Sequence, residues 1–456
     1  MEHRKTAEVT ELHAFLEKHP AITHLDAFVI DLCGNAIGKR LPRSHMEKLY
    51  TTGTPVCAAM QLVDVLGNTA DPMGHGFSDG DPDAFAVPVS GMLAPVPWMG
   101  PGRAQVLCQY QSAKDRAPLW YEPRHVLERV AACFGELGVK PVVAVELEFY
   151  LIEARRDDST LPRSALSPRT RAAESQGKVL SLAKLDEFDG VLSALERACE
   201  AQRIPSTTMI SEYGAGQFEL NLEHRDDPVR AADDGALLRR VVQGVARSEG
   251  LDATFMSKPF ADQSASGLHI HLSLQNDGGE NVFDPKFKNG DAILGHAIAG
   301  LKATMAEAMA IFAPNINVYR RFKPDQFVPV TTDWGENNRS VAFRLPVHDG
   351  ESRRVEHRVA GAEANPYLVM AAVLAGVHYG LINKLDPGAK HSGNAGAEVD
   401  AMLPLTPWEA IRAIENAKIL PDYLGADYPK IYAQVKQAEF DAFMGETFPR
   451  EFEWYL

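Results

Sequence analysis

The seven residues LHIHLSL, from residue 268 to residue 274, alternate without a break between apolar and polar side chains. A period of two is typical of a β-strand, because neighbouring side chains of a strand point to opposite faces. The simplest interpretation is a half-buried strand whose polar face is exposed to solvent. Here that polar face carries His269, His271 and Ser273.

Three further stretches alternate in the same way, VELEFY from residue 145, FELNLE from residue 218 and RVEHRV from residue 354. Solvated strand faces usually collect Lys, Thr, Ser and Gln, whereas these collect Glu, His and Arg, which bind cations and phosphates. We therefore predict strands of one sheet whose polar face lines a cavity. The polar side chains are Glu146 and Glu148; Glu219, Asn221 and Glu223; and Arg354, Glu356 and Arg358.

Longer amphipathic or apolar segments predict helices, and residues 195–202 continue another one. Short strands separated by Gly, Pro and Asp clusters precede residue 110, and a polar excursion at 155–178 is predicted to be a surface loop. Because strands and helices do not alternate regularly, we expect an α+β protein with an antiparallel or mixed sheet braced by helices. The predicted helices cover residues 9–18, 123–137, 229–249, 292–313, 362–383 and 407–417.

At 456 residues the chain exceeds the size at which one core stops growing, so two domains are expected. We predict a small N-terminal domain at residues 1–115 and a larger one at 116–456. The formal net charge of -15 argues against general nucleic-acid binding and against docking on anionic membranes. The longest apolar run, residues 367–382, is interrupted by Gly and His and is predicted to be a buried core helix.

The five cysteines are scattered and include no CxxC pair, which suits neither a disulfide framework nor a zinc site. The N-terminus, MEHRKTAEVTELH, is too charged for a signal peptide. We therefore expect reduced thiols and a cytoplasmic protein.

Five carboxylates and one imidazole stand out as potential metal ligands. A carboxylate-rich set with one imidazole suits Mg²⁺ or Mn²⁺ rather than zinc or copper. Six ligands exceed the needs of one such ion, so we expect two or more ions of the kind that clamp a transferring phosphoryl group. The ligand candidates are Glu146, Glu148, Glu212, Glu219, His269 and Glu356.

Six arginines fall within about forty residues of one another. Any single one could form a surface ion pair, but metal-binding carboxylates and arginines together indicate phosphoryl transfer to an acidic substrate. The sequence has no GxxxxGK[ST] and no GxGxxG, which argues against P-loop, protein-kinase and Rossmann enzymes. The arginines are Arg320, Arg321, Arg339, Arg344, Arg354 and Arg358.

Six motifs in order resemble the type I glutamine synthetase family over essentially the whole chain. They are ExE at 146–148, ExxxGQxE at 212–219, SGxHxHxS at 266–273, NRS at 338–340, RxExR at 354–358 and ANPY at 364–367. The resemblance implies an N-terminal β-grasp domain, a glutamine-synthetase-like catalytic domain, and homo-oligomers of hexameric rings, as hexamers or dodecamers, with active sites between neighbouring subunits.

The resemblance also implies a role for each matching residue. One metal site would use Glu148, Glu212 and Glu219, and the other Glu146, His269 and Glu356. ATP would be bound by His271, Ser273 and Arg354, and its γ-phosphoryl group by Arg339 and Arg344. Glutamate would be bound by Arg321 and Arg358, beside Gly267. The implied reaction transfers the γ-phosphoryl group to the side-chain carboxylate of glutamate, and a nitrogen nucleophile then attacks the γ-glutamyl phosphate.

One segment departs from the family. Glutamine synthetases read like RLxPGYEAP where this chain reads RFKPDQFVP at 321–329, so Phe327 takes the place of the Glu that closes the ammonium site. A ring without hydrogen-bond acceptors cannot replace the hydration shell of ammonium, but it suits a larger amine and offers a cation–π contact of roughly 0.5 to 2 kcal/mol. Ser264-Ala265 also replaces an Asn-Gly of the family, and no tyrosine matches its adenylylation site.

These departures are similar to the γ-glutamylamine branch, which includes the γ-glutamylpolyamine synthetases. We therefore expect an ATP-dependent ligase that joins glutamate to an organic mono- or polyamine, in amine catabolism. Asp64 of a neighbouring subunit, Asp325 and Glu336 are candidates for the base that deprotonates the amine. The alternatives are a true glutamine synthetase using ammonia and a catalytically weak nitrogen-regulatory homologue, although the chain keeps all six ligands and the arginines.

Overall fold

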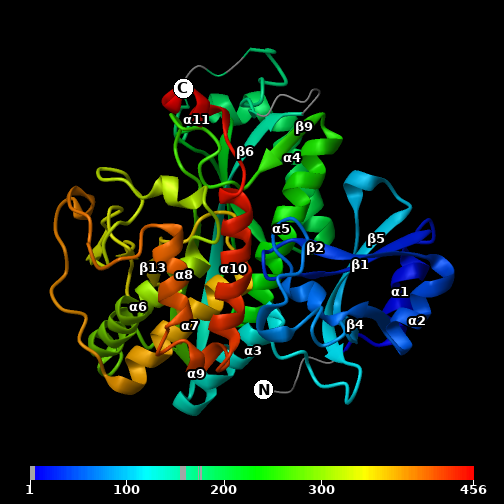
Figure 1. The fold of residues 1–456 in the computed structure, drawn as a ribbon, viewed down its shortest axis with the longest axis horizontal. Helices are drawn as coiled ribbons and strands as arrows, with labels where there is room; N and C mark the ends of the chain where they lie inside the picture. Colours follow the sequence, from blue (N-terminus) through cyan, green and yellow to red (C-terminus); the bar gives the residue numbers. More distant parts are fainter. Residues whose placement is uncertain (1–5, 155–160, 173, 175–176) are drawn as a thin grey trace.

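The computed structural model describes residues 6–154, 161–172, 174 and 177–456. A five-stranded sheet with two helices forms the N-terminal part, on the right of Figure 1. Its strands lie in the order β2-β1-β5-β4-β3, with β1 and β5 parallel and the other neighbours antiparallel. The elements are α1 (Val9–Lys18), β1 (His24–Ile30), β2 (Ala36–Pro42), α2 (Arg43–Thr51), β3 (Thr54–Cys57), β4 (Asp83–Pro95) and β5 (Arg103–Ser112).

The larger part is built on an eight-stranded sheet in the order β11-β12-β13-β10-β6-β8-β7, with β9 paired to β6. Its pairs are antiparallel except β11 with β12, the one departure from an antiparallel sheet. The predicted α+β class is thus confirmed. The strands are β6 (Val139–Glu153), β7 (Ser206–Ser211), β8 (Gln217–Leu222), β9 (Leu251–Thr254), β10 (Leu268–Asn276), β11 (Trp334–Glu336), β12 (Phe343–Leu345) and β13 (Val355–His357).

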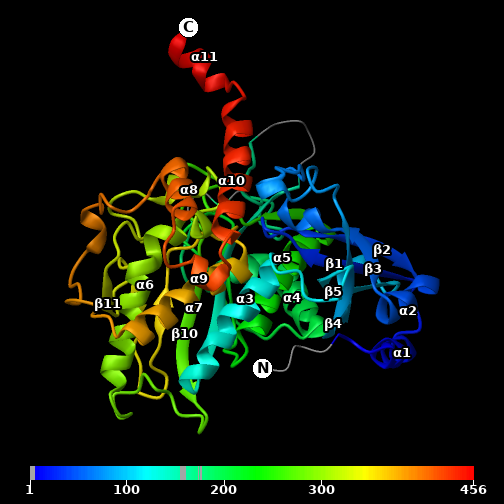
Figure 2. The ribbon, with the colours of Figure 1, turned by 60° about the horizontal axis from the view of Figure 1, so that its bottom comes forward.

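Helices brace this sheet, and α10 and α11 rise from the body toward the C-terminus in Figure 2. Arg240 of α5 joins the two parts, because it pairs with Asp26 of β1 at 3.1 Å and donates to Gln105 of β5 at 2.6 Å. The helices are α3 (Pro123–Ala132), α4 (Leu182–Gln202), α5 (Pro228–Ser248), α6 (Gly290–Phe312), α7 (Pro366–Asn383), α8 (Pro407–Glu415), α9 (Pro421–Leu424), α10 (Tyr428–Met444) and α11 (Pro449–Tyr455).

The alternation of β6 and β10 decides which face of the sheet is buried. The apolar residues of β10 from Leu268 to Leu274 are at most 1% exposed. On the same side of the sheet, Val145 of β6 lies against Gly235 of α5, which in turn contacts Pro366 at the start of α7. The apolar face therefore packs against helices, and the polar residues that alternate with it face the other way.

Several boundaries differ from the sequence-based expectations for local reasons. The helix expected at 362–383 begins at Pro366, because the Asn365 side chain accepts hydrogen bonds from the first turn. The segment 195–202 is only the last part of α4, and α10 was not predicted. The helix expected at 123–137 becomes a 3₁₀ helix after Ala132. Within the loop expected at 155–178, residues 155–160, 173 and 175–176 lie outside the described residues.

Helix α7 is long and apolar enough to cross a membrane by length and composition alone. However, 78% of its most apolar window is buried inside the protein. This burial agrees with the predicted core helix at 367–382.

Helices α6 and α7 pack backbone against backbone. A Cβ atom added to Gly380 of α7 would lie 2.0 Å from the carbonyl oxygen of His296 in α6 and 2.7 Å from the nitrogen of Gly300. Only glycine permits this approach.

We expect Gly380→Ala to lower the free energy of unfolding by about 3 kcal/mol, because the helices must separate. The matched control is Gly190→Ala in α4, where an added Cβ meets nothing within 4 Å. That change should stabilise the protein by about 0.5 to 1 kcal/mol through helix propensity. Denaturant unfolding measures both, and equal effects of the two substitutions would contradict the packing argument.

Candidate active site

The four alternating stretches form one continuous polar face, as predicted. Antiparallel pairing places His269 of β10 opposite Glu146 of β6, and His271 opposite Glu356 of β13. On the other side of β6, Glu148 lies opposite Glu219 of β8. Directly opposite residues of neighbouring strands have their side chains on the same face. Pairing thus gathers residues that are more than two hundred positions apart in the chain.

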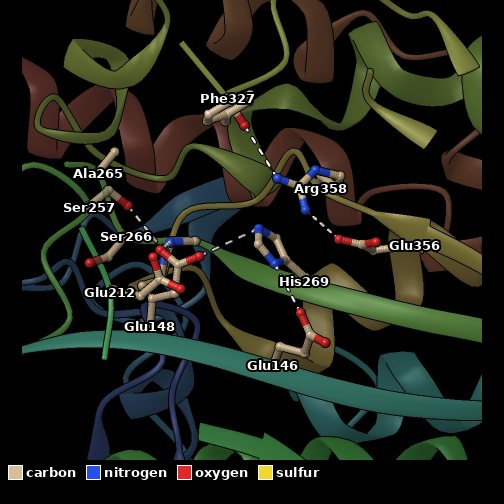
Figure 3. A network of polar contacts seen from close by, with 12 residues as sticks. Glu146, Glu148, Glu212, Ser257, Ala265, Ser266, His269, Phe327, Glu356 and Arg358 are labelled. Atoms are coloured by element: carbon tan, nitrogen blue, oxygen red, sulfur yellow. Dashed lines mark hydrogen bonds and ion pairs between the residues drawn. The ribbon is translucent and has the colours of Figure 1, made fainter. Parts of the chain in front are cut away.

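Two histidines and two glutamates form the centre of this face, and Figure 3 shows His269 between Glu146 and Glu148. The Nδ1 atom of His269 lies 3.3 Å from Glu146 Oε2, and its Nε2 atom lies 3.8 Å from Glu148 Oε1. The Nε2 atom of His271 lies 2.7 Å from Glu146 Oε1. Arg354 Nε donates to His271 Nδ1 at 3.1 Å, so the Nδ1 atom accepts and the Nε2 atom faces Glu146.

Two groups of potential ligand atoms lie within 4.8 Å of one another, one from Glu146, His269 and Glu356, the other from Glu148, Glu219 and His269. The first group equals one predicted metal site. The second shares Glu148 and Glu219 with the other predicted site, where Glu212 was expected as the third ligand. Glu212 lies beside Glu148 in Figure 3. The assignment of these residues as ligands stays a prediction.

The carboxylates of this cluster repel one another. Burial, followed by the charge of Glu212, raises the pKa of Glu148 to about 8. Burial and the charges of Glu146 and Glu148 raise the pKa of Glu219 well above its ordinary value. Burial also disfavours a charged Glu146, but His271 and His269 hold its pKa well below the usual range. A divalent cation would remove this repulsion, and oxygen ligands with one imidazole fit Mg²⁺ or Mn²⁺.

Two arginines converge on Glu356. Arg344 Nη1 lies 2.5 Å from Glu356 Oε2, and Arg358 donates to Oε1 (Figure 3). Although burial opposes it, the charge of Arg358 lowers the pKa of Glu356 to about 2. Arg321 is buried as well and donates to the carbonyl oxygen of Val359 at 3.2 Å.

The Nε atoms of Arg321, Arg344 and Arg358 are buried and have no hydrogen-bond partner among the described residues. Buried donors of this kind carry a desolvation cost until an acceptor reaches them. An anionic substrate such as a carboxylate or a phosphate offers those acceptors.

A cavity of about 310 Å³ is lined by residues that include Phe327 and Arg339 but none of the candidate metal ligands. The Phe327 side chain is 62% exposed. Its main-chain carbonyl oxygen accepts a hydrogen bond from Arg358 Nη2 at 3.5 Å, so the arginine that holds Glu356 also holds the cavity wall. No hydrogen bond or ion pair engages the Arg339 guanidinium within the described part of the chain.

Gly267 lies between the carboxylates and the arginines. Its backbone N–H donates to Glu148 Oε2 at 2.9 Å. A Cβ atom there would lie 2.8 Å from His269 Nε2 and 3.4 Å from Arg321 Nη2. Glycine therefore keeps open the space between two predicted binding groups.

Three predicted residues form no hydrogen bond or ion pair with the cluster in the described part of the chain. The carboxylate of Asp64 accepts hydrogen bonds from Leu66 and Asn68 of its own turn, at 2.9 and 2.8 Å. Glu336 forms an exposed ion pair with Lys390 at 3.1 Å. Ser273 follows His271 on the polar face of β10, and its side chain forms no hydrogen bond within the described residues.

Sequence reasoning missed two residues that position the cluster. Gln217 donates to Ser266 Oγ at 3.1 Å and to the carbonyl oxygen of Ala265 at 3.0 Å. It belongs to the ExxxGQxE motif but was given no role. The buried Lys184 of α4 donates to the carbonyl oxygens of Gly214 and Glu212, at 2.7 and 3.3 Å. The sequence predicted only the C-terminal end of α4. A prediction that began the helix at Leu182 would have included Lys184 among its buried residues.

We expect divalent cations to stabilise the protein more at pH 8 than at pH 6. The folded state raises the pKa of Glu148 to about 8. The stability that Glu148 contributes is therefore fully present at a pH below its unfolded-state pKa, and it is lost as the pH rises toward about 8. A cation binds the ionised form and reverses that loss. The increase in melting temperature with Mg²⁺ or Mn²⁺ should be larger at pH 8, by about 2 °C or more. EDTA-treated protein is the control, and equal increases at both pH values would contradict the expectation.

Comparisons with known proteins give one consistent result. Residues 120–455 match the family model described as glutamine synthetase, catalytic domain. The chain is 38% identical to gamma-glutamylputrescine synthetase PuuA of Escherichia coli (strain K12), covering 100% of this chain and 96% of that protein. It is 31% identical to a glutamate–isopropylamine ligase of Pseudomonas sp, covering 96% and 95%. A solved GmaS/ADP complex superposes with a TM-score of 0.83 at 25% identity, covering 97% of this chain and 99% of that chain.

Proposed function

The chain belongs to the glutamine synthetase family of ATP-dependent ligases, and we propose that it joins the γ-carboxylate of glutamate to an organic amine. Phe327 carries this proposal, because it places an aromatic wall in the cavity beside Arg339 where an ammonium site would need acceptors. The likeness to proteins named for putrescine and isopropylamine supports an organic amine as the nitrogen donor.

The carboxylate cluster and His269 would hold two divalent ions, Mg²⁺ or Mn²⁺. Such ions supply Lewis-acid stabilisation of the charge on phosphoryl oxygens. The ligands would be divided as the resemblance implies, with Glu148, Glu212 and Glu219 on one ion and Glu146, His269 and Glu356 on the other. The raised pKa values of Glu148 and Glu219 support this use, because a bound cation makes ionised carboxylates favourable there.

The arginines would position the two anionic substrates. Arg321 and Arg358 would bind the carboxylates of glutamate beside Gly267, where the gap between His269 and Arg321 stays open. The γ-phosphoryl group would be bound by Arg339 and Arg344. His271, Ser273 and Arg354 would contact ATP from the next part of the polar face. The positive charge of the arginines would stabilise the oxygens on which negative charge builds during phosphoryl transfer.

The amine would then attack the γ-glutamyl phosphate from the cavity that Phe327 lines. The ring would pack against the hydrocarbon part of the amine and exclude water from the acyl phosphate. We also propose that the enzyme works in the cytoplasm as hexameric rings, in which Asp64 of a neighbouring subunit faces the site as a candidate base.

The test is glutamate-dependent release of phosphate from ATP with Mg²⁺ or Mn²⁺. Ammonium, hydrophobic monoamines, putrescine and spermidine are compared, and the product is identified by mass. We expect stimulation by an organic amine and formation of the γ-glutamylamide. Omitting glutamate is the control for uncoupled ATP hydrolysis.

Other outcomes would favour the alternatives. Stimulation by ammonium alone would assign the protein to glutamine synthesis, despite Phe327. ATP binding without turnover on any nitrogen donor would favour a regulatory homologue. The retention of all six ligand candidates and of the arginines makes that outcome the less expected one.

A further inference from the structure

The cavity beside Phe327 contains one carboxylate to which the proposed reaction assigns no binding role. Asp325 lines this space together with Phe327, Arg339 and Asn394. At about 310 Å³ the cavity is near the lower end of the range for small-molecule sites. Glutamine synthetases have glycine at this position and Glu two residues later, whereas this chain has Asp325 and Phe327, so the carboxylate stands two residues earlier.

The backbone and side chain of Asp325 are held in place. Its backbone has a positive φ of 57°, which is uncommon for a residue with a side chain. Its N–H donates to the carbonyl oxygen of Gly396 at 2.9 Å, and Asn394 Nδ2 donates to its Oδ1 at 2.8 Å. Among the described residues no hydrogen bond reaches Oδ2 and no cation pairs with the carboxylate. One oxygen is therefore available to a ligand.

Asp325 lies within reach of a small amine that packs on Phe327. Residues two positions apart have Cα atoms at most about 7 Å apart. Arg339 places a positive charge in the same cavity, but a phosphoryl group bound there would neutralise it. The carboxylate of Asp325 would then be the only charge in the cavity lining without a counterion. An apolar amine tail would remove water from this carboxylate without supplying a cation, which is unfavourable.

Building on the proposed ligase activity, we propose that Asp325 binds a second cationic group at the distal end of the amine. The preferred substrate is then a diamine or a polyamine, and apolar monoamines are poorer substrates. Phe327 packs against the carbon chain between the reacting nitrogen and the distal cation. Asp325 acts here as a specificity-determining residue, separate from the group that removes the proton of the attacking nitrogen.

The test compares a four-carbon diamine with the four-carbon monoamine in the wild type and in Asp325→Asn. Asparagine keeps an oxygen that can accept from Asn394 and removes the charge. We expect kcat/KM for the diamine to fall about three- to fivefold, mainly through KM, because an exposed ion pair is lost. For the monoamine kcat/KM should change less than about twofold. Glu398→Gln is the matched control, since it removes an exposed carboxylate outside the cavity lining and should alter neither value.

A second measurement needs no variant. Because salt screens ion pairs, raising the ionic strength should increase the wild-type KM for the diamine more than that for the monoamine. Equal losses for both amines in Asp325→Asn would assign Asp325 to the chemistry or to folding and overturn the inference. A wild type that prefers the monoamine would overturn it as well, while leaving the proposed ligase intact. A wild type that uses no organic amine would overturn the ligase itself, before any variant is made.

Discussion

Replacing Glu356 by alanine should reduce ATP turnover by about a thousandfold or more. Glu356 is a candidate metal ligand in the cluster with Glu146 and His269, and loss of a bound ion removes several kcal/mol of stabilisation from the phosphoryl transition state. The substitution also leaves the buried Arg358 and the half-buried Arg344 without their counterion, so the free energy of unfolding should fall by about 3 kcal/mol. Phosphate release and denaturant unfolding measure the two effects.

The chain offers a control for the second effect. Asp234 is buried between Arg225 and Arg230 in the same way that Glu356 is buried between two arginines, but it lies on α5 away from the cluster. Asp234→Ala should also destabilise the protein and should leave the turnover of the folded enzyme within about twofold. Unchanged turnover in Glu356→Ala would refute the metal assignment.

The substitution Phe327→Glu should shift the nitrogen donor from organic amines toward ammonium. A carboxylate supplies the acceptors that ammonium requires, and a charge-assisted hydrogen bond contributes about 1.5 to 3 kcal/mol, or about 10- to 100-fold. The same carboxylate removes the apolar wall that packs on a larger amine. The ratio of kcat/KM for ammonium to kcat/KM for the preferred amine should therefore rise at least tenfold.

Phe327→Leu is the control for this shift. Leucine keeps an apolar wall and removes the ring face, so amine use should fall only by the cation–π contribution of roughly 0.5 to 2 kcal/mol. Ammonium use should not increase. If Phe327→Glu leaves the preference unaltered, Phe327 does not contact the nitrogen donor.

Sequence patterns predicted local structure well where one period dominated. The alternation at 268–274 correctly predicted β10, and the apolar period at 229–249 predicted α5 to within a residue. They did less well where the composition is mixed, as in α10, which has proline as its second residue and carries lysines and acidic residues among its aromatics. Helix α4 was found only at its C-terminal end for the same reason.

The site depended on information that local patterns lack. Alternation predicted that His269 and Glu146 each lie on a polar face, but their pairing is set by the register between β10 and β6. The register could not be read from the sequence, so the assignment of the candidate ligands to two metal sites came from the resemblance to a known family. Gln217 and Lys184 were not predicted, because their side chains donate hydrogen bonds to backbone carbonyls and to a serine. Such contacts leave no periodic signal in the sequence.

The face that carries the candidate metal ligands and the cavity wall at Phe327 differ in their backbone structure. The candidate ligands lie mostly on paired strands, where a change of register would move every side chain. Phe327 and Asp325 belong to a segment without strand pairing. At its exposed positions, residues 323–327, substitutions should change the cavity wall without altering the strand register that gathers the candidate ligands. A laboratory library confined to residues 323–327 should therefore alter the choice of nitrogen donor while leaving the protein core intact.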